Sequence, residues 1–171
     1  MISCTRKKSR IVHDYVVDDV SIQKMSVVKD LGVWLDEKLN YKHHMDVTVL
    51  RRNSVLIIVK RFASEFQDPY VLKNLYYSLV RSLIEYGSVV WMPLYQVDID
   101  RIESIQKQFL LFCLRNLGWR DRFHLPSYKQ RLTLIGMIPL RDRQEVQCCT
   151  FIHDIQSGRI KSLSLQSGHS I

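Results

Sequence analysis

The fold is decided around Leu83-Ile84-Glu85-Tyr86-Gly87-Ser88-Val89-Val90-Trp91-Met92-Pro93, where a long amphipathic helix is expected to end. Apolar residues leading into this stretch recur every three or four positions, which is the period of one face of an α-helix. Asp68-Pro69 supplies an N-cap and a first helical residue, and Pro93 supplies the stop. The expected buried stripe is Leu72, Leu75, Tyr76, Leu79, Val80, Leu83, Ile84 and Gly87.

Three residues of this helix carry further expectations. Gly87 would lie mid-helix, where glycine costs about 1 kcal/mol relative to alanine, so the close approach of another segment is the natural reason for it. Tyr86 and Trp91 each join a large apolar ring to a polar tip, and we expect both tips to find hydrogen-bond partners. The segment therefore predicts a central core helix.

The N-terminal part is predicted to contain short β-strands. Residues 11–17 and 20–28 are rich in β-branched side chains, and Asp18-Asp19 between them predicts the turn of a hairpin. Leu31, Val33 and Leu35 alternate on one face, which predicts a third strand. Two or three strands are not stable by themselves in water, so we expect a helix or further sheet to cover them.

Helical periodicity replaces this alternation from Asn40 onward. After the central helix, a further helix is expected with Asp98 as its cap and Gly118 as its left-handed stop, followed by a short helix after Pro126-Ser127 and a last helix over about residues 140–156. The fold class predicted is α+β and mainly α, with a short β-hairpin or strands followed by a bundle of about four to five helices. Asn40 is the expected cap of a helix with the buried stripe Met45, Val49, Arg52, Leu56, Val59, Ala63 and Phe66, widened by Val55 and Phe62.

The composition indicates a globular chain with a moderate basic excess. Of 171 residues, 46% are hydrophobic, and 25 Lys and Arg against 17 Asp and Glu give a formal charge of +8. An excess of this size fits nucleic-acid binding and equally fits a solvated basic surface. Because there is no apolar leader, no C-x-x-C pair and no apolar run of membrane-spanning length, we expect an intracellular location (cytoplasm or nucleus), reduced thiols and no membrane contact.

Catalytic and metal-binding patterns are weak in this sequence. The run from Tyr15 to Asp18-Asp19 is similar to the aromatic-x-Asp-Asp turn that holds Mg²⁺ in polymerases, but two residues rather than one separate the aromatic ring from the aspartates. His43-His44 are adjacent and would point in different directions on a helix, so they make a poor zinc pair. No Gly-rich phosphate loop and no activated nucleophile is present. We expect no catalytic residue, no metal, no cofactor and no enzyme activity of the isolated chain.

Basic residues near aromatic ones form the remaining candidate site. Lysine and arginine bind phosphates, and an aromatic ring stacks on an exposed base, so this pairing suits a nucleic acid. The alternative is that these residues are solvated positions on helix surfaces. The candidate nucleic-acid-binding residues are Arg51, Arg52, Lys60, Arg61, Trp119 and Arg122.

Several stretches, taken in order, resemble the region that follows the catalytic turn in reverse transcriptases of jockey-like non-LTR retrotransposons. The resemblance covers nearly the whole chain and is carried by the order and spacing of the runs. One departure is Gln144, where the family commonly has a second arginine after Arg143. The runs are Thr5-Arg6-Lys7-Lys8-Ser9 with Tyr15, V-K-D-L-G-V-W-L-D from Val28 to Asp36 with Leu39 and His44, Leu75-Tyr76-Tyr77-Ser78-Leu79-Val80, Leu83 to Pro93, Ile102-Glu103-Ser104-Ile105-Gln106-Lys107-Gln108-Phe109, Tyr128-Lys129-Gln130-Arg131-Leu132, and Leu140 with Arg143 and residues 151–160.

The resemblance implies a division of the chain. Residues 1–36 would be an edge of the polymerase palm with its primer grip, 37–118 a thumb-like helical bundle, and 119–161 a helical extension. Residues 162–171 are rich in serine, and this composition predicts a disordered tail. The resemblance further implies that Leu31-Gly32-Val33 would support the primer terminus and that the helices would follow an RNA/DNA template–primer.

The function expected from the resemblance is that of a fragment. The fingers, most of the palm and the catalytic aspartates are not among the matched runs, so we expect a nucleic-acid-gripping piece of an RNA-directed DNA polymerase without its catalytic site. The alternative is a non-catalytic helical protein-interaction module, or a transposon remnant without function, whose exposed apolar faces bind a partner or associate.

Overall fold

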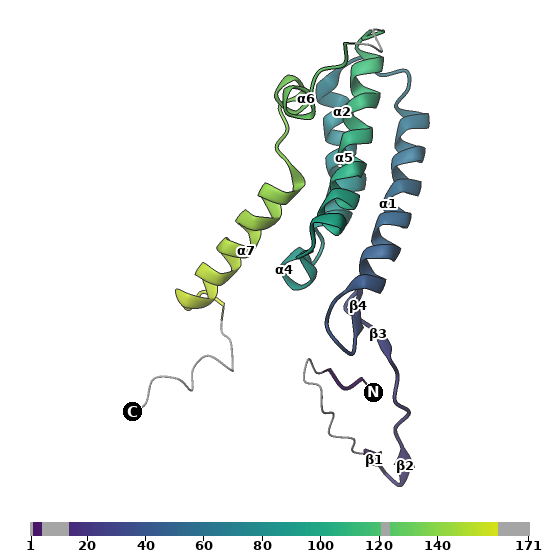
Figure 1. Ribbon diagram of the computed structural model, residues 1–171, viewed down its shortest axis with the longest axis vertical. Coiled ribbons are helices and arrows are strands. Elements are labelled where there is room, and N and C mark those ends of the chain that lie inside the picture. The colour runs from purple at the N-terminus through teal and green to yellow at the C-terminus, as the bar shows by residue number, and fades with distance from the viewer. Residues whose placement is uncertain (1, 5–13, 121–123, 161–171) are drawn as a thin grey trace.

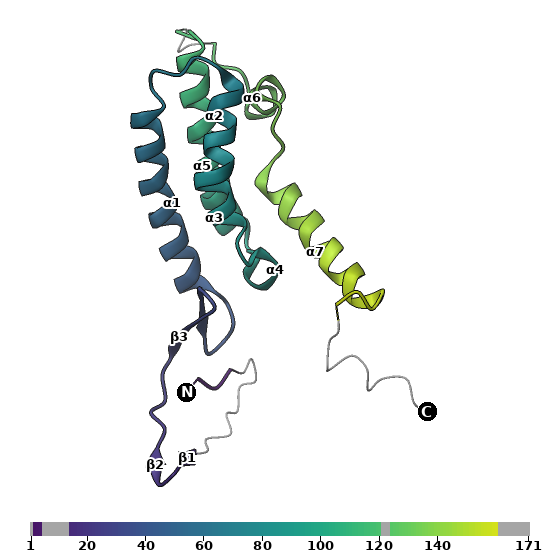
Figure 2. The same cartoon turned by 180° about the vertical axis from the view of Figure 1, so that it is seen from behind.

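The computed structural model describes residues 2–4, 14–120 and 124–160, and within these ranges the chain is α+β and mainly α. Long helical segments run side by side, and two small β-hairpins lie at one end of them (Figure 1). Seen from behind, the last helix diverges from the bundle (Figure 2). The predicted fold class is confirmed, while the predicted tail at 162–171 lies outside the described residues.

Both β-hairpins turn through two residues with positive φ. β1 (Val16–Val17) pairs with β2 (Val20–Ser21) around Asp18-Asp19, whose φ angles are 48° and 61°. The predicted turn is therefore confirmed, although these strands are much shorter than expected, and residues 11–13 lie outside the described residues. β3 (Val27–Asp30) pairs with β4 (Val33–Asp36) around Leu31-Gly32, with φ angles of 43° and 85°.

The β3–β4 turn corrects one prediction. Asp30 pairs with Val33, so Leu31 lies in the turn and does not alternate with Val33 on the face of a strand. Two-residue turns with positive φ match the twist of paired antiparallel strands, and this requirement overrides the apolar alternation read from the sequence. The expected strand therefore begins at Val33.

α1 (Lys42–Phe62) begins where two side chains bind free backbone amides. The N-cap position is Tyr41, one residue after the predicted cap Asn40. Asn40 Oδ1 nevertheless accepts from the Lys42 amide at 2.9 Å, and the Asp36 carboxylate accepts from the Tyr41 amide at 2.7 Å. Met45, Leu56, Val59 and Ala63 are buried as expected, but Phe62 and Phe66 are exposed. The predicted core positions of the two phenylalanines are wrong: the neighbouring helices cover only the other side of α1 at Phe62, and Phe66 lies in the loop after α1 has ended.

The central segment consists of several helical pieces. α2 (Pro69–Tyr76) starts at the predicted cap Asp68, which accepts from the Tyr70 amide at 2.8 Å. A π-helical turn, η1 (Tyr77–Arg81), and α3 (Ser82–Glu85) continue it. The helix then breaks, Gly87 takes a φ of 63°, and one further turn, α4 (Ser88–Trp91), follows. Gly87 is thus a left-handed corner residue and not a mid-helix residue, because glycine reaches this conformation without steric cost.

In the central segment, every fourth residue is buried. Leu79 and Leu83 are 46% and 38% exposed, so the prediction that they are buried is wrong. The i→i+5 hydrogen bonds of η1 underwind the helix, which keeps residues spaced by four on one face. The fully buried residues are Leu72, Tyr76, Val80 and Ile84.

α5 (Gln96–Asn116) packs against both α1 and α2 and completes the core. The Phe109 ring stacks on the Tyr76 ring with 4.2 Å between their centroids. Gly118 has a φ of 86° and the Trp119 amide donates to the Leu114 carbonyl at 2.9 Å, which is the predicted left-handed stop. The predicted N-cap at Asp98 is wrong, because α5 begins at Gln96 after the N-cap Tyr95 and Asp98 lies in the first turn.

The two C-terminal helices confirm their predicted bounds. α6 (Tyr128–Ile135) starts at Ser127, which forms a reciprocal capping box with Gln130, and it ends at the left-handed Gly136. α7 (Leu140–Gln156) follows Pro139. α6 packs on α5, and α7 contacts α4 and α5.

The corrected stripe gives a stability prediction. Ile84→Ala removes a fully buried side chain and should lower the free energy of unfolding by about 2–5 kcal/mol. Leu83→Ala, on the neighbouring position of α3, should lower it by roughly 1 kcal/mol or less, because its side chain is already partly in water. Urea denaturation of both variants measures the difference, and equal losses would contradict this assignment of the core.

Candidate nucleic-acid interface

The β3–β4 turn is held against the corner at Tyr86-Gly87. The Tyr86 hydroxyl donates to the Leu31 carbonyl at 2.9 Å, and a Cβ added at Gly32 would lie 3.1 Å from the Tyr86 ring. A Cβ at Gly87 would lie 3.3 Å from the Val33 side chain. The close approach expected at Gly87 is therefore confirmed. Two of the sequence runs that carry the resemblance, one with Leu31 and one with Tyr86, meet here although these residues are 55 positions apart.

The indole of Trp91 fixes the shape of this corner. Trp91 Nε1 donates to the Tyr86 carbonyl at 2.8 Å, and the Trp91 ring is buried. Together with the Tyr86 hydroxyl bond, this confirms that both aromatic tips have partners. Because the carbonyl of Tyr86 has left the helical hydrogen-bond pattern at the corner, the indole also satisfies an acceptor that would otherwise be free.

The three primer-grip-like residues differ in what they offer a ligand. Leu31 is 83% exposed at the tip of the turn. Gly32 allows the turn to pack on the Tyr86 ring, and Val33 is buried. Only Leu31 presents a side chain to a bound molecule, while Gly32 and Val33 position the turn.

His44 connects the hairpin to α1 and to the corner. Its Nδ1 accepts from the Trp34 amide at 3.3 Å, its Nε2 lies 3.3 Å from Thr48 Oγ1, and its ring centroid lies 4.9 Å from that of Trp91. Burial lowers the pKa of His44, and the nearby Arg52 and His43 lower it further. A neutral imidazole is required, since a protonated Nδ1 could not accept the Trp34 amide.

The four candidate basic residues of α1 do not share one face. Arg51 and Arg61 are exposed, whereas Arg52 and Lys60 are half-buried. An α-helix turns by about 100° per residue, so Arg51 and Lys60, which are nine residues apart, point in nearly opposite directions. Arg52 Nε is buried and has no hydrogen-bond partner among the described residues. Burial lowers the pKa of Arg52, and the positive charge of the neighbouring Arg51 lowers it further. Arg51 and Arg61 are thus the residues of this set most open to phosphates.

A second basic group lies where α1 and α5 end. Burial and the charge of Arg115 lower the pKa of Lys60, so these two cations lie near each other. The Asn116 amide donates to the carbonyls of Ala63 at 3.1 Å and Phe66 at 3.2 Å, which ties the two helix ends together. Trp119, partly exposed, follows α5 at this same end. Arg122 lies outside the described residues.

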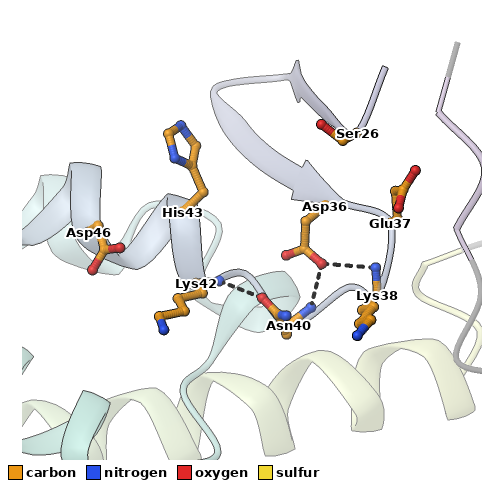
Figure 3. Close-up of a pocket in the computed structure, with 8 residues that line it drawn as sticks. All are labelled: Ser26, Asp36, Glu37, Lys38, Asn40, Lys42, His43 and Asp46. Carbon is orange, nitrogen blue, oxygen red and sulfur yellow. Dashed lines mark hydrogen bonds between the residues drawn. The ribbon is translucent and has the colours of Figure 1, made fainter. Parts of the chain in front are cut away.

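A hollow of about 450 Å³ lies where the β3–β4 hairpin meets α1 (Figure 3). Asp36 is committed to the loop, because it also accepts from the amides of Lys38 at 2.9 Å and Asn40 at 3.2 Å. The lining carries acidic and basic side chains together, so it favours neither an anion nor a cation. The hydrogen bonds of Asp36 and Asn40 fix where α1 begins. No group of three or more His, Cys, Asp or Glu in the described ranges could hold a metal ion. The lining residues are Ser26, Asp36, Glu37, Lys38, Asn40, Lys42, His43 and Asp46.

A buried polar network on α5 was missed by sequence reasoning. The Glu103 carboxylate accepts from the Tyr128 hydroxyl and from the Leu140 amide at 3.2 Å, and Gln106 Nε2 donates to the Ile138 carbonyl at 2.9 Å. Burial and the bond to Glu103 raise the pKa of Tyr128 well above its usual value. The available signal was a Glu and a Gln within the apolar stripe of α5, since buried polar groups need partners.

A second missed group anchors α7 at the corner. Arg143 Nη2 donates to Glu85 Oε2 at 3.1 Å, and Gln147 Nε2 donates to the same oxygen at 3.4 Å. Ser88 Oγ donates to Gln147 Oε1 at 2.7 Å. Glu85 and Ser88 belong to the stretch that decides the fold, so the corner that holds the hairpin also holds the last helix.

Comparisons with known proteins do not identify a family. No family model, curated protein or solved structure matches the chain. In the described part of the chain, no helix combines the length and the apolar character needed to span a membrane.

The environment of His44 predicts a pH dependence of stability. Because the pKa of His44 is lower in the folded chain than the ordinary value of 6.5, the unfolded chain binds more protons between the two values. The contribution of His44 is therefore complete above about pH 6.5 and is lost as the pH falls through the folded pKa. Urea midpoints at pH 7.5 and pH 5.0 should differ less for His44→Gln than for the wild type. The control is His153→Gln at an exposed position of α7, which should keep most of the wild-type difference. An unchanged difference in His44→Gln would contradict this account.

Proposed function

We propose that this chain is the primer-grip and thumb-like part of a non-LTR retrotransposon reverse transcriptase and that it binds a template–primer duplex. The contact between Tyr86 and Leu31 carries the proposal, because it joins the run assigned by resemblance to the primer grip with the run assigned to the thumb-side helix. A turn that presents an apolar tip beside a helical bundle suits contact with the end of a primer strand.

The dimensions and charges of the bundle support a duplex as the ligand. α1 has 21 residues and is therefore about 31 Å long, close to one turn of a double helix. Leu31 lies at the hairpin end, and Arg51 and Arg61 are exposed along α1. Backbone phosphates are the natural partners of cations spaced in this way, so binding is independent of base sequence.

Duplex binding is tested by its salt dependence. An RNA/DNA hybrid should bind with an affinity that falls steeply with KCl, because each neutralised phosphate adds about 0.9 to the log–log slope on a B-form duplex. Arg51→Ala/Arg61→Ala should lower both the affinity and the slope, by up to about 2 in the slope. Trp119→Ala should weaken binding with little change of slope, because stacking is not a charge interaction.

The matched control for this titration removes two arginines elsewhere. Arg141 and Arg159 lie on and after α7 and pair with Glu145 and Asp154. Arg141→Ala/Arg159→Ala changes the net charge equally and should leave most of the slope unchanged. Absent or salt-insensitive binding, or equal losses in both double variants, would contradict the proposed interface.

The proposal includes the absence of primer extension by this chain. Asp18 and Asp19 form an exposed two-residue turn, with the spacing from Tyr15 that differs from the polymerase motif. Purified chain should therefore extend no primer with Mg²⁺ or Mn²⁺. Extension that is lost in Asp18→Asn/Asp19→Asn would overturn this part of the proposal.

A protein-interaction module is the second candidate. The observation that favours it is the row of large apolar side chains exposed on α1, which includes Leu50, Ile57 and Phe62. Exposed apolar surface of this kind is typical of contact sites between proteins. A chain that binds no duplex but associates with protein would support this candidate.

A further inference from the structure

The side of α1 that faces away from the core is apolar. Leu50, Ile57, Ile58 and Phe62 are between 53% and 77% exposed, and Ser54 lies among them. Single exposed apolar residues are ordinary, but four within four turns of one helix form a continuous surface. We define the α1 outer face as Leu50, Ser54, Ile57, Ile58, Arg61 and Phe62.

We propose that a second copy of this chain docks on the α1 outer face, with the two α1 helices antiparallel around a twofold axis at Ser54. Leu50 and Ile58 lie four residues before and after Ser54. In an antiparallel pair centred there, each Leu50 therefore meets Ile58 of the other copy. Apolar side chains therefore face each other on both sides of the axis, as a self-complementary twofold interface requires at its centre.

Ser54 suits the centre of such an interface. Its hydroxyl donates to the Leu50 carbonyl at 3.1 Å within the same helix. The hydroxyl is thus already satisfied, and covering it leaves no unpaired donor. The small side chain also allows the two helices to approach closely at the axis.

The charges on α1 favour the antiparallel orientation of the two helices. Asp46 lies near the start of the helix and Arg61 near its end, so an antiparallel pair brings Arg61 toward Asp46 of the other copy. A parallel pair would instead place Arg61 against Arg61. Asp46 already binds Arg101 at 2.6 Å, but its side chain is 46% exposed and retains room for a second cation. Opposed helix dipoles favour the same orientation.

The area available predicts a weak and reversible dimer. Side chains of this size and exposure present on the order of 100 Å² each, so the two faces bury on the order of 800 Å² of apolar surface. With the flanking side chains, this reaches the lower range of specific protein interfaces. The dimer does not depend on duplex binding, although a duplex lying across Arg51 and Arg61 would compete for the same face.

Sedimentation velocity without nucleic acid tests the dimer. The wild type should pass from monomer to dimer as its concentration rises. Ile57→Asp should stay monomeric, whereas Val146→Asp, an equivalent change at an exposed residue of α7, should dimerise like the wild type. Circular dichroism verifies that both variants fold, since both positions face water. A wild type that is monomeric throughout, or Ile57→Asp that dimerises normally, would overturn the proposal, whatever the duplex titration gives.

Cross-linking tests the position of the axis. Ser54→Cys is made in a chain with Cys4, Cys148 and Cys149 replaced by serine; Cys113 stays, because burial raises its pKa to about 12. Mild oxidation should give a covalent dimer, since residues at a twofold axis lie within disulfide range. Ser82→Cys, an exposed helical serine with the same type of hydroxyl bond, is the control and should remain monomeric. Equal cross-linking of both variants, or none of Ser54→Cys, would exclude the antiparallel pair.

Discussion

The corner at Tyr86-Gly87 is the constraint on which the rest of the structure depends. Its backbone leaves the helix at Tyr86, and the Trp91 indole binds the carbonyl exposed there. From the corner, the Tyr86 hydroxyl reaches the β3–β4 turn. Glu85 reaches Arg143 on α7, and Trp91 packs on His44 of α1. Segments from both ends of the chain are thus positioned by one short stretch of sequence.

The hairpin depends on this corner for its stability. A two-stranded hairpin is marginal in water, so its strands need a surface to pack on. The bond from Tyr86 to Leu31 contributes about 1 kcal/mol, which is small by itself. The larger effect is steric, because Gly32 lets the turn lie flat on the Tyr86 ring and Val33 enters the core beside Gly87. Any larger residue at Gly32 would need both a strained φ and a displaced ring.

The sequence predicted most helix boundaries but not the path of the central segment. Caps and stops such as Asp68, Ser127 and Gly118 act locally, so their residue types and spacing are sufficient to find them. Gly87 fits both a mid-helix close contact and a left-handed corner, and only tertiary packing decides between them. The exposure of Leu79 and Leu83 follows from the π-helical turn, which has no simple signature in the residues.

The candidate site was predictable only in part, because tertiary packing decides which of its side chains are exposed. The hydrogen-bonded tips of Tyr86 and Trp91 were indicated by residue type. The turn at Leu31-Gly32 was not, and the orientation of basic residues around α1 depends on which helices cover it. Arg52 and Lys60 lie toward covered sides, which leaves Arg51 and Arg61 open. The partners of Glu103 come from α6 and α7, far along the chain, so its role could not be read locally.

The central claim is that the hairpin turn and the helix corner form one unit, and nuclear Overhauser contacts measure this directly. In isotope-labelled protein, the Hα protons of Gly32 should show strong contacts with the ring protons of Tyr86, because a Cβ in their place would lie 3.1 Å from the ring. The same spectrum should show contacts between the Val33 methyl groups and Gly87. If the helices give native spectra but both sets of contacts are absent, the hairpin does not dock on the corner, and the account of the fold and of the proposed interface is wrong.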